Sequence, residues 1–140
     1  MIRDFQSSDM EDVLNIWLSA SIHAHDFVAK EFWESKVVEM REVYLPASES
    51  YVYEENGYIK GFVSLYGETL AAIFVLPNAQ RQGIGKQLIQ KAQERRQTLN
   101  LSVYKENTPS IEFYHKCGFL PVKKQVDKHT GHLEVVMVWR

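Results

Sequence analysis

Residues 74–90, FVLPNAQRQGIGKQLIQ, constrain the fold more than any other stretch of this chain. An apolar run stops at Pro77, and Gly83 and Gly85 then stand where a helical pattern begins. Apolar residues recur there at near-helical spacing, at Ile84, Leu88, Ile89 and Ala92. Glycine lets the backbone curl and approach a ligand closely. The first N–H groups of a helix are unpaired and partly positive. The stretch therefore predicts a strand, a loop that cradles a phosphate-like anion, and a helix.

Three kinds of phosphate loop compete for this stretch. A Walker loop, G-x-x-x-x-G-K-[ST], fails because Gln80 and Gln87 occupy two of its required positions. A dinucleotide-binding fingerprint, G-x-G-x-x-G, fails because Leu88 replaces its third glycine. The third pattern, Q-x-x-G-x-G after a strand that ends in Val-x-Pro, is matched in full by Gln80, Gly83 and Gly85.

A second stretch, ENTPSIEFYHKCGF at residues 106–119, follows at a distance that leaves room for one helix and one strand. It has an asparagine, a Phe-Tyr pair about seven residues later, and then Gly-Phe. With both stretches in this order, the chain resembles the GNAT superfamily of N-acetyltransferases, which bind acetyl-coenzyme A.

The rest of the chain predicts elements in the order βαα-βββ-αβ-αββ. Ser8 and Glu11 have the spacing of a capping box for the first helix. The second helix is expected to start near Asp26 and to run toward Tyr44, with Pro46 ending it. Strands are expected near residues 2–5, on both sides of Asn56-Gly57, and at 70–76, 99–104, 118–126 and 132–140. This order predicts an α/β fold with one mixed sheet covered by helices, and the resemblance implies the GNAT-like acyl-CoA N-acyltransferase fold.

Length and charge limit the classes of function. The 140 residues predict a single domain, 1–140, and the single cysteine permits no internal disulfide. A formal net charge of −2 does not favour nucleic acid or an anionic membrane as a partner. Without an apolar signal segment or membrane span, the chain is expected to be a cytoplasmic monomer or homodimer.

The resemblance implies where acetyl-CoA, as cosubstrate, is bound. The pyrophosphate is expected on the loop Arg81, Gln82, Gly83, Ile84, Gly85 and Lys86. The pantetheine arm is expected between strands 70–76 and 99–104, which splay apart in this family. It would contact Ile73, Phe74 and Val75, the side chain of Asn107, and Tyr114. No metal is expected.

The resemblance also implies the reaction, in which an acetyl group passes to a primary amine by direct attack in a ternary complex. A backbone N–H near Val75 would face the thioester carbonyl. Tyr114 would act as the acid, since a phenol with an ordinary pKa of about 10 keeps its proton at neutral pH. Small amines, peptide N-termini and protein lysines all stay open as acceptors. A catalytically silent coenzyme A sensor or interaction module with this fold is the alternative, and a nucleotide-phosphate-binding protein is a third class.

The segment SIHAHDF, residues 21–27, is expected to form one wall of the acceptor pocket. It places His23, His25 and Phe27 close together in a region that varies with acceptor choice in this family. His25 is the expected base, with an acidic limb of kcat/KM in the histidine range. A surface or capping role for His25, and Glu68 or water as the base, remain open. Cys117 is interpreted as a packing residue rather than a nucleophile.

Overall fold

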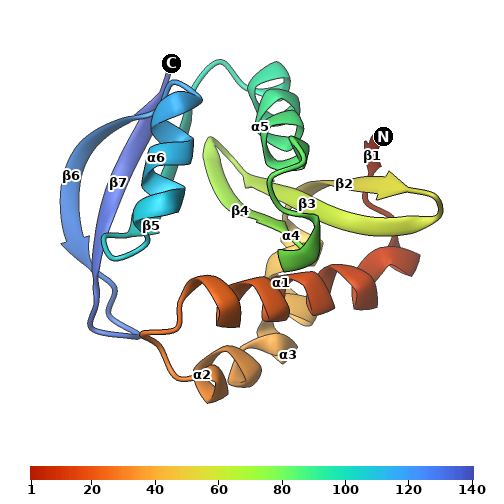
Figure 1. Ribbon diagram of the computed structural model, residues 1–140, viewed down its shortest axis with the longest axis horizontal. Helices are drawn as coiled ribbons and strands as arrows, with labels where there is room; N and C mark the ends of the chain where they lie inside the picture. Colours follow the sequence, from red (N-terminus) through yellow and green to blue (C-terminus); the bar gives the residue numbers. More distant parts are fainter.

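The computed structural model describes residues 1–140 and contains one seven-stranded mixed sheet with helices on both faces (Figure 1). The strands are β1 (Ile2–Asp4), β2 (Glu49–Glu55), β3 (Tyr58–Tyr66), β4 (Thr69–Val75), β5 (Leu99–Tyr104), β6 (Leu120–Val126) and β7 (Leu133–Trp139). The α-helices are α1 (Met10–Ala24), α2 (Lys30–Ser35), α3 (Val37–Glu39), α4 (Leu45–Ala47), α5 (Ile84–Arg95) and α6 (Thr108–Lys116). None of the helices is both long enough and apolar enough to cross a membrane. The mixed α/β architecture is the predicted one.

The sheet has the strand order β1-β2-β3-β4-β5-β7-β6. All neighbouring strands are antiparallel except β4 and β5, which run parallel. This parallel pair is joined only at Thr69 and Asn100, and the two strands diverge beyond that point (Figure 1). The sheet is therefore divided into two halves, as the splayed strands of the sequence-based prediction require.

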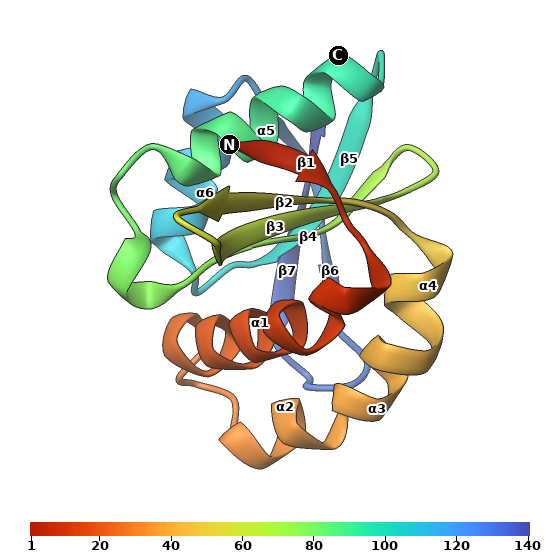
Figure 2. The same cartoon turned by 90° about the vertical axis from the view of Figure 1, so that its right-hand side faces the viewer.

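Helices cover the two faces of the first half of the sheet. Figure 2 shows α5 on one side of strands β2, β3 and β4 and α1 on the other. Successive residues of β3 point to opposite faces, so Phe62 packs in the cluster that contains α1 whereas Val63 packs in the cluster that contains α5. Both side chains are 0% exposed. Two apolar layers thus hold β4 and the start of α5 in place.

The first helix differs from its prediction at both ends. A 3₁₀ turn, Ser7–Asp9, precedes α1, and its capping box uses Gln6 and Asp9 rather than Ser8 and Glu11: the Asp9 carboxylate accepts a hydrogen bond from the Gln6 amide at 2.8 Å. The Asp9 carboxylate is held in this capping position because Arg3 on β1 donates two hydrogen bonds to it, at 2.8 and 2.9 Å. At the other end α1 runs to Ala24, so most of the segment 21–27 is helical and does not interrupt the helix.

The second predicted helix is broken into short pieces. It begins at Lys30 rather than near Asp26, and a π-helical turn, Met40–Tyr44, separates α3 from α4. Pro46 lies in the first turn of α4 and does not end a helix, because proline is tolerated where the N–H would be unpaired. Residues 25–29 are consequently a loop that reaches the divergent end of β5.

Candidate active site

A cleft with a volume of about 820 Å³ lies where β4 and β5 diverge. Its walls come from both strands, from the starts of α5 and α6, and from the end of α1. All the predicted site residues except Gln82 line it: His23, His25, Phe27, Ile73, Phe74, Val75, Arg81, Gly83, Ile84, Gly85, Lys86, Asn107 and Tyr114. The fold thus brings residues that are far apart in the sequence to one cleft.

The backbone of β4 presents free polar groups to this cleft. The Leu76 amide donates to the Lys60 carbonyl on β3 at 2.9 Å. Because backbone groups alternate in direction along an antiparallel strand, Ile73 and Val75 must turn their N–H and C=O groups away from β3 and toward the gap. The Val75 carbonyl accepts a hydrogen bond of 3.1 Å from the Gln80 side chain. An extended ligand with amide groups can pair with these positions as an added strand does.

The loop before α5 is curved by two residues with left-handed backbone, Arg81 at φ +66° and Gly83 at φ +81°. Gly83 is the N-cap of α5, and no side chain caps the first N–H groups of the helix. The first turn also contains no acidic residue. Free N–H groups, the positive helix end, and the cations Arg81 and Lys86 fit the pyrophosphate of coenzyme A.

Gly85 joins this loop to the second sequence signature. A Cβ atom at position 85 would lie 3.3 Å from the ring of Phe113 on α6, which is tighter than an ordinary contact. A side chain at this position would require the Phe113 ring to shift by a few tenths of an ångström. The two signatures, separate in the sequence, therefore meet at one glycine.

Asn107 is buried and forms the N-cap of α6. Its Oδ1 accepts a hydrogen bond from the Ser110 amide at 3.4 Å, and its Nδ2 lies 3.3 Å from His25 Nε2. An amide nitrogen has two hydrogens, so one remains for a ligand in the cleft. The predicted contact between Asn107 and the pantetheine arm is compatible with this geometry.

Tyr114 lies on α6 and lines the cleft between the rings of Phe113 and Phe119, with centroids at 5.5 and 5.9 Å. Burial raises the pKa of the Tyr114 phenol above its ordinary value, and negative charge on the Cys117 thiol would raise it further. The phenol therefore keeps its proton throughout the physiological range. It can donate that proton, or a hydrogen bond, but it cannot act as a base there.

Cys117 ends α6 as its C-cap and is partly buried. Burial raises the pKa of its thiol, and the positive charge of Lys86 opposes this effect. A thiol with a raised pKa is a poor nucleophile at neutral pH. Packing, the predicted role of Cys117, agrees with this environment.

His25 is the C-cap of α1, lines the cleft and is 9% exposed. The rings of Tyr104, Trp33 and Phe27 surround it at centroid distances of 5.1, 5.3 and 5.9 Å. Burial lowers the pKa of His25 to about 4, although the backbone of Ser21 opposes the change. This environment argues against the expected ionisation of His25 in the ordinary histidine range, because a buried imidazole resists charge.

Glu68, the second candidate base, is not part of the cleft. It is exposed in the turn between β3 and β4, beside the point where β4 and β5 still pair. Its backbone carbonyl accepts a hydrogen bond from the Asn100 amide at 2.9 Å. The turn is at the closed end of the splay, which removes Glu68 from the candidates.

Two carboxylates that the sequence did not single out line the cleft, together with Asp26. Glu106 lies 3.1 Å from Nδ1 of His132, and Glu134 accepts a hydrogen bond from Gln125 at 3.0 Å. Glu106 stands directly before Asn107, so the second signature could have suggested it. Glu134 had no such signal, because its position depends on the pairing of β7 with β5.

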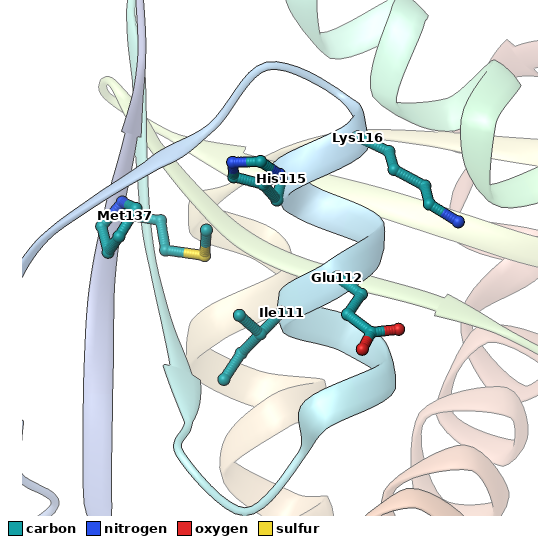
Figure 3. Close-up of a pocket in the computed structure, with 6 residues that line it drawn as sticks. Ile111, Glu112, His115, Lys116 and Met137 are labelled. Atoms are coloured by element: carbon teal, nitrogen blue, oxygen red, sulfur yellow. The ribbon is translucent and has the colours of Figure 1, made fainter.

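A second hollow of about 260 Å³ lies beside α6, where Ile111 faces Met137 of β7 (Figure 3). Glu112 and Lys116 also line it and extend from the opposite side of the helix to Ile111. None of the predicted site residues borders this hollow. The larger cleft is therefore the candidate active site.

Comparison with known proteins agrees with this fold and cleft. Residues 46–121 match the family described as the acetyltransferase (GNAT) domain. The chain is 42% identical over 120 residues to the peptidyl-lysine N-acetyltransferase YiaC of Escherichia coli (strain K12), over 85% of this chain and 82% of that protein. The solution structure of apo-form YjaB from Escherichia coli has a TM-score of 0.86 at 25% identity, over 99% of this chain and 96% of that one. The PaiA N-acetyltransferase from Thermoplasma acidophilum, crystallised with coenzyme A, shares the fold with a TM-score of 0.84 at 18% identity, over 100% and 98% of the two chains.

Proposed function

The chain belongs to the acetyltransferase (GNAT) family and is an acetyl-CoA-dependent N-acetyltransferase; from this premise we propose that its acceptor is the ε-amine of a lysine in a peptide or protein. The YiaC relative is named for this acceptor. The observation that carries the proposal is that the cations lining the cleft belong to the glycine loop, whereas the carboxylates Asp26 and Glu106 are chain neighbours of the hydrogen-bonded pair His25 and Asn107.

The cofactor end would hold acetyl-CoA through backbone groups. The loop from Arg81 to Lys86 would receive the pyrophosphate, and the free backbone of Ile73 and Val75 would pair with the pantetheine arm. Asn107 would donate its remaining amide hydrogen to the same arm. Acetyl-CoA, when bound, supplies an activated acetyl thioester.

The acceptor end would receive a cation beside apolar surface. Asp26, Glu106 and Glu134 line this end, together with the ring of Phe27. A lysine side chain combines an apolar stem with a cationic head, so the aromatic wall and the carboxylates suit its two parts. Opposite charges at the two ends would steer the anionic cofactor and the cationic acceptor to different places.

The amine must lose a proton before it attacks, and His25 is a weak acceptor for that proton. An alkyl ammonium has a pKa of about 10.4, whereas burial lowers the pKa of His25 to about 4. The gap of more than six pK units corresponds to about 9 kcal/mol for direct transfer. We assign the proton to bulk solvent, lost before attack in an equilibrium that costs about 5 kcal/mol at pH 7 for a pKa of about 10.4, and give His25 a hydrogen-bonding role.

Two groups would act on the thioester itself. The Val75 N–H points into the cleft, where it would stabilise negative charge that develops on the carbonyl oxygen. The Tyr114 hydroxyl, held neutral by burial, would give its proton or a hydrogen bond to the departing sulfur. Cys117 is not activated as a nucleophile, so a route through an acetylated cysteine is disfavoured. The amine would instead attack the thioester directly in a ternary complex.

Three amine acceptors test the proposal. The first is a peptide with a blocked N-terminus and one lysine, the second is the same peptide with norleucine for lysine and a free N-terminus, and the third is spermidine. Thiol release is measured with each, and mass spectrometry locates the acetyl group. We expect release with the lysine peptide and modification of its ε-amine. Modification of the N-terminus or of spermidine alone would refute the lysine acceptor, and cofactor binding without release for any amine would support the silent sensor.

A further inference from the structure

One buried hydrogen bond connects the two ends of the cleft. His25, the C-cap of α1, and Asn107, the N-cap of α6, are 82 positions apart in the chain, and their side-chain nitrogens lie 3.3 Å apart. Both residues are at least nine-tenths buried, at 9% and 8% exposed. The bond therefore joins the acceptor wall to the helix that carries Tyr114.

The direction of this bond follows from its neighbours. Oδ1 of Asn107 accepts from the Ser110 amide, so the other end of the Asn107 side chain, Nδ2, faces His25 as a donor. The His25 Nε2 must then be the unprotonated acceptor, which puts the single ring proton on Nδ1. Nδ1 is buried without a partner at ordinary hydrogen-bond geometry, and the nearby Ser21 backbone, which opposes the fall in the pKa of His25, is compatible with a proton on that nitrogen.

The aromatic residues around His25 keep its ring neutral and restrict its rotation. Tyr104, Trp33 and Phe27 enclose it with no charged partner among them. An aromatic enclosure favours the neutral ring over the charged one, and only the neutral ring can accept from Asn107. The same enclosure limits rotation of the ring, so the acceptor nitrogen has a defined position.

We propose that His25 is a positioning residue that acts through Asn107: its Nε2 orients the Asn107 amide so that the remaining Nδ2 hydrogen points to the pantetheine arm of the cofactor. This inference rests on the proposed binding of coenzyme A in the cleft. It is independent of the identity of the acceptor, and it replaces proton abstraction as the function of His25.

A matched pair of variants tests the proposal by calorimetry with coenzyme A and no acceptor. His25→Phe keeps an aromatic ring in the enclosure and removes the acceptor nitrogen, whereas His25→Gln restores an acceptor atom close to the position of Nε2. We expect His25→Phe to weaken coenzyme A binding roughly three- to tenfold, as for the loss of one hydrogen bond, and His25→Gln to recover most of the affinity. Equal loss in both variants, or no loss in His25→Phe, would overturn the proposal.

A double-mutant cycle separates action through Asn107 from a general effect of the wall. If His25 acts through Asn107, His25→Phe should cost no further affinity in an Asn107→Ala background. A loss as large as in the parent background would mean that His25 acts by another route. Thermal unfolding of each variant identifies any that fail to fold.

Nitrogen NMR of the unmodified protein tests the proposal without a variant. The imidazole of His25 should show a protonated Nδ1 and an unprotonated Nε2 at neutral pH. The opposite tautomer, or a mixture of the two, would contradict the inferred direction of the bond. Coenzyme A that fails to bind the parent protein would instead contradict the proposed function, so the two failures are distinguishable.

Discussion

The two ends of the cleft are built from different kinds of sequence. The cofactor end comes mainly from one continuous unit, residues 73–86, in which a strand, a loop and a helix start follow one another. The acceptor end is assembled from Phe27 before α2, Glu106 between β5 and α6, and Glu134 on β7. Local backbone geometry thus makes the anion site, whereas tertiary packing makes the amine site.

This difference predicts that the two ends respond separately to mutation, apart from His25, which is proposed to act on the cofactor through Asn107. Changes in the glycine loop should alter cofactor affinity and leave acceptor choice intact. Changes in the carboxylates should alter acceptor use and leave cofactor affinity intact. Tyr114 lines the cleft and its hydroxyl is assigned to the departing sulfur, so it should affect the chemical step alone.

The largest effect is expected for Tyr114→Phe, which removes only a hydroxyl. Loss of one general acid typically slows a reaction by about a hundred- to ten-thousandfold. We expect kcat to fall by this amount with the lysine peptide, while calorimetry gives nearly the parental affinity for coenzyme A. Parental turnover in this variant would exclude Tyr114 as the acid, and a matching loss of cofactor affinity would assign it to binding instead.

The next effect concerns the pH dependence of stability and the burial of His25. The pKa of this residue falls from 6.5 in the unfolded chain to about 4 in the folded one. Between these values the unfolded chain binds a proton that the folded protein does not, so stability falls as the pH falls from 6.5 toward 4. The loss approaches roughly 3 kcal/mol, from two and a half pK units at about 1.4 kcal/mol each.

Denaturant unfolding between pH 7 and 4 measures this loss, and His25→Phe is the control because it lacks the group. Its stability should depend less steeply on pH than that of the parent. Glu49 does not obscure the comparison: hydrogen bonds from Tyr51 and from Arg96 and Arg95 lower its pKa from 4.5 to about 2, so its contribution is lost between these values, and it changes only the lower edge of the window, equally in both proteins. Parallel curves for the two proteins would show that His25 titrates normally.

A smaller effect is expected for Gly83→Asp, which tests whether the glycine loop binds an anion. A side chain at φ +81° costs about 1–2 kcal/mol of backbone strain, and the carboxylate would repel the pyrophosphate. Gly57→Asp is a matched control, since Gly57 has the same φ of +81° in the β2–β3 turn and nothing within 4 Å of an added Cβ. Calorimetry should show at least about tenfold weaker coenzyme A binding for Gly83→Asp than for Gly57→Asp. Equal affinities in the two variants would show that this loop does not bind the pyrophosphate.

The smallest effect is expected at the acceptor end, where the charges are partly exposed. Glu106→Gln and Glu134→Gln should each raise KM for the lysine peptide about two- to fivefold, since exposed charge pairs contribute little. Glu112→Gln, on the far side of α6, is the control and should not change KM. Added salt should shrink the difference between variants and parent. A weaker affinity for coenzyme A in either cleft variant would break the division between the two ends.

The sequence was sufficient for features that depend on neighbouring residues. The order of strands and helices follows from apolar periodicity and from Asn56-Gly57, and the loop at Gly83 and Gly85 follows from backbone freedom at a helix start. Tyr114 and Asn107 could be singled out as candidate site residues because their spacing within residues 106–119 is a local pattern. Each of these features needs only the chain within a few turns of itself.

Tertiary structure decided the features that depend on contacts between distant residues. Arg3 made Asp9 rather than Ser8 part of the capping box, and the closed end of the splay removed Glu68 from the site. An ionisation near 6.5 was predicted for His25 because its neighbours in sequence are not Trp33 and Tyr104, whose rings withhold water from it in the folded chain. A pKa depends on desolvation, and desolvation depends on how distant residues pack. The sequence of residues 21–27 alone therefore does not determine the pKa of His25.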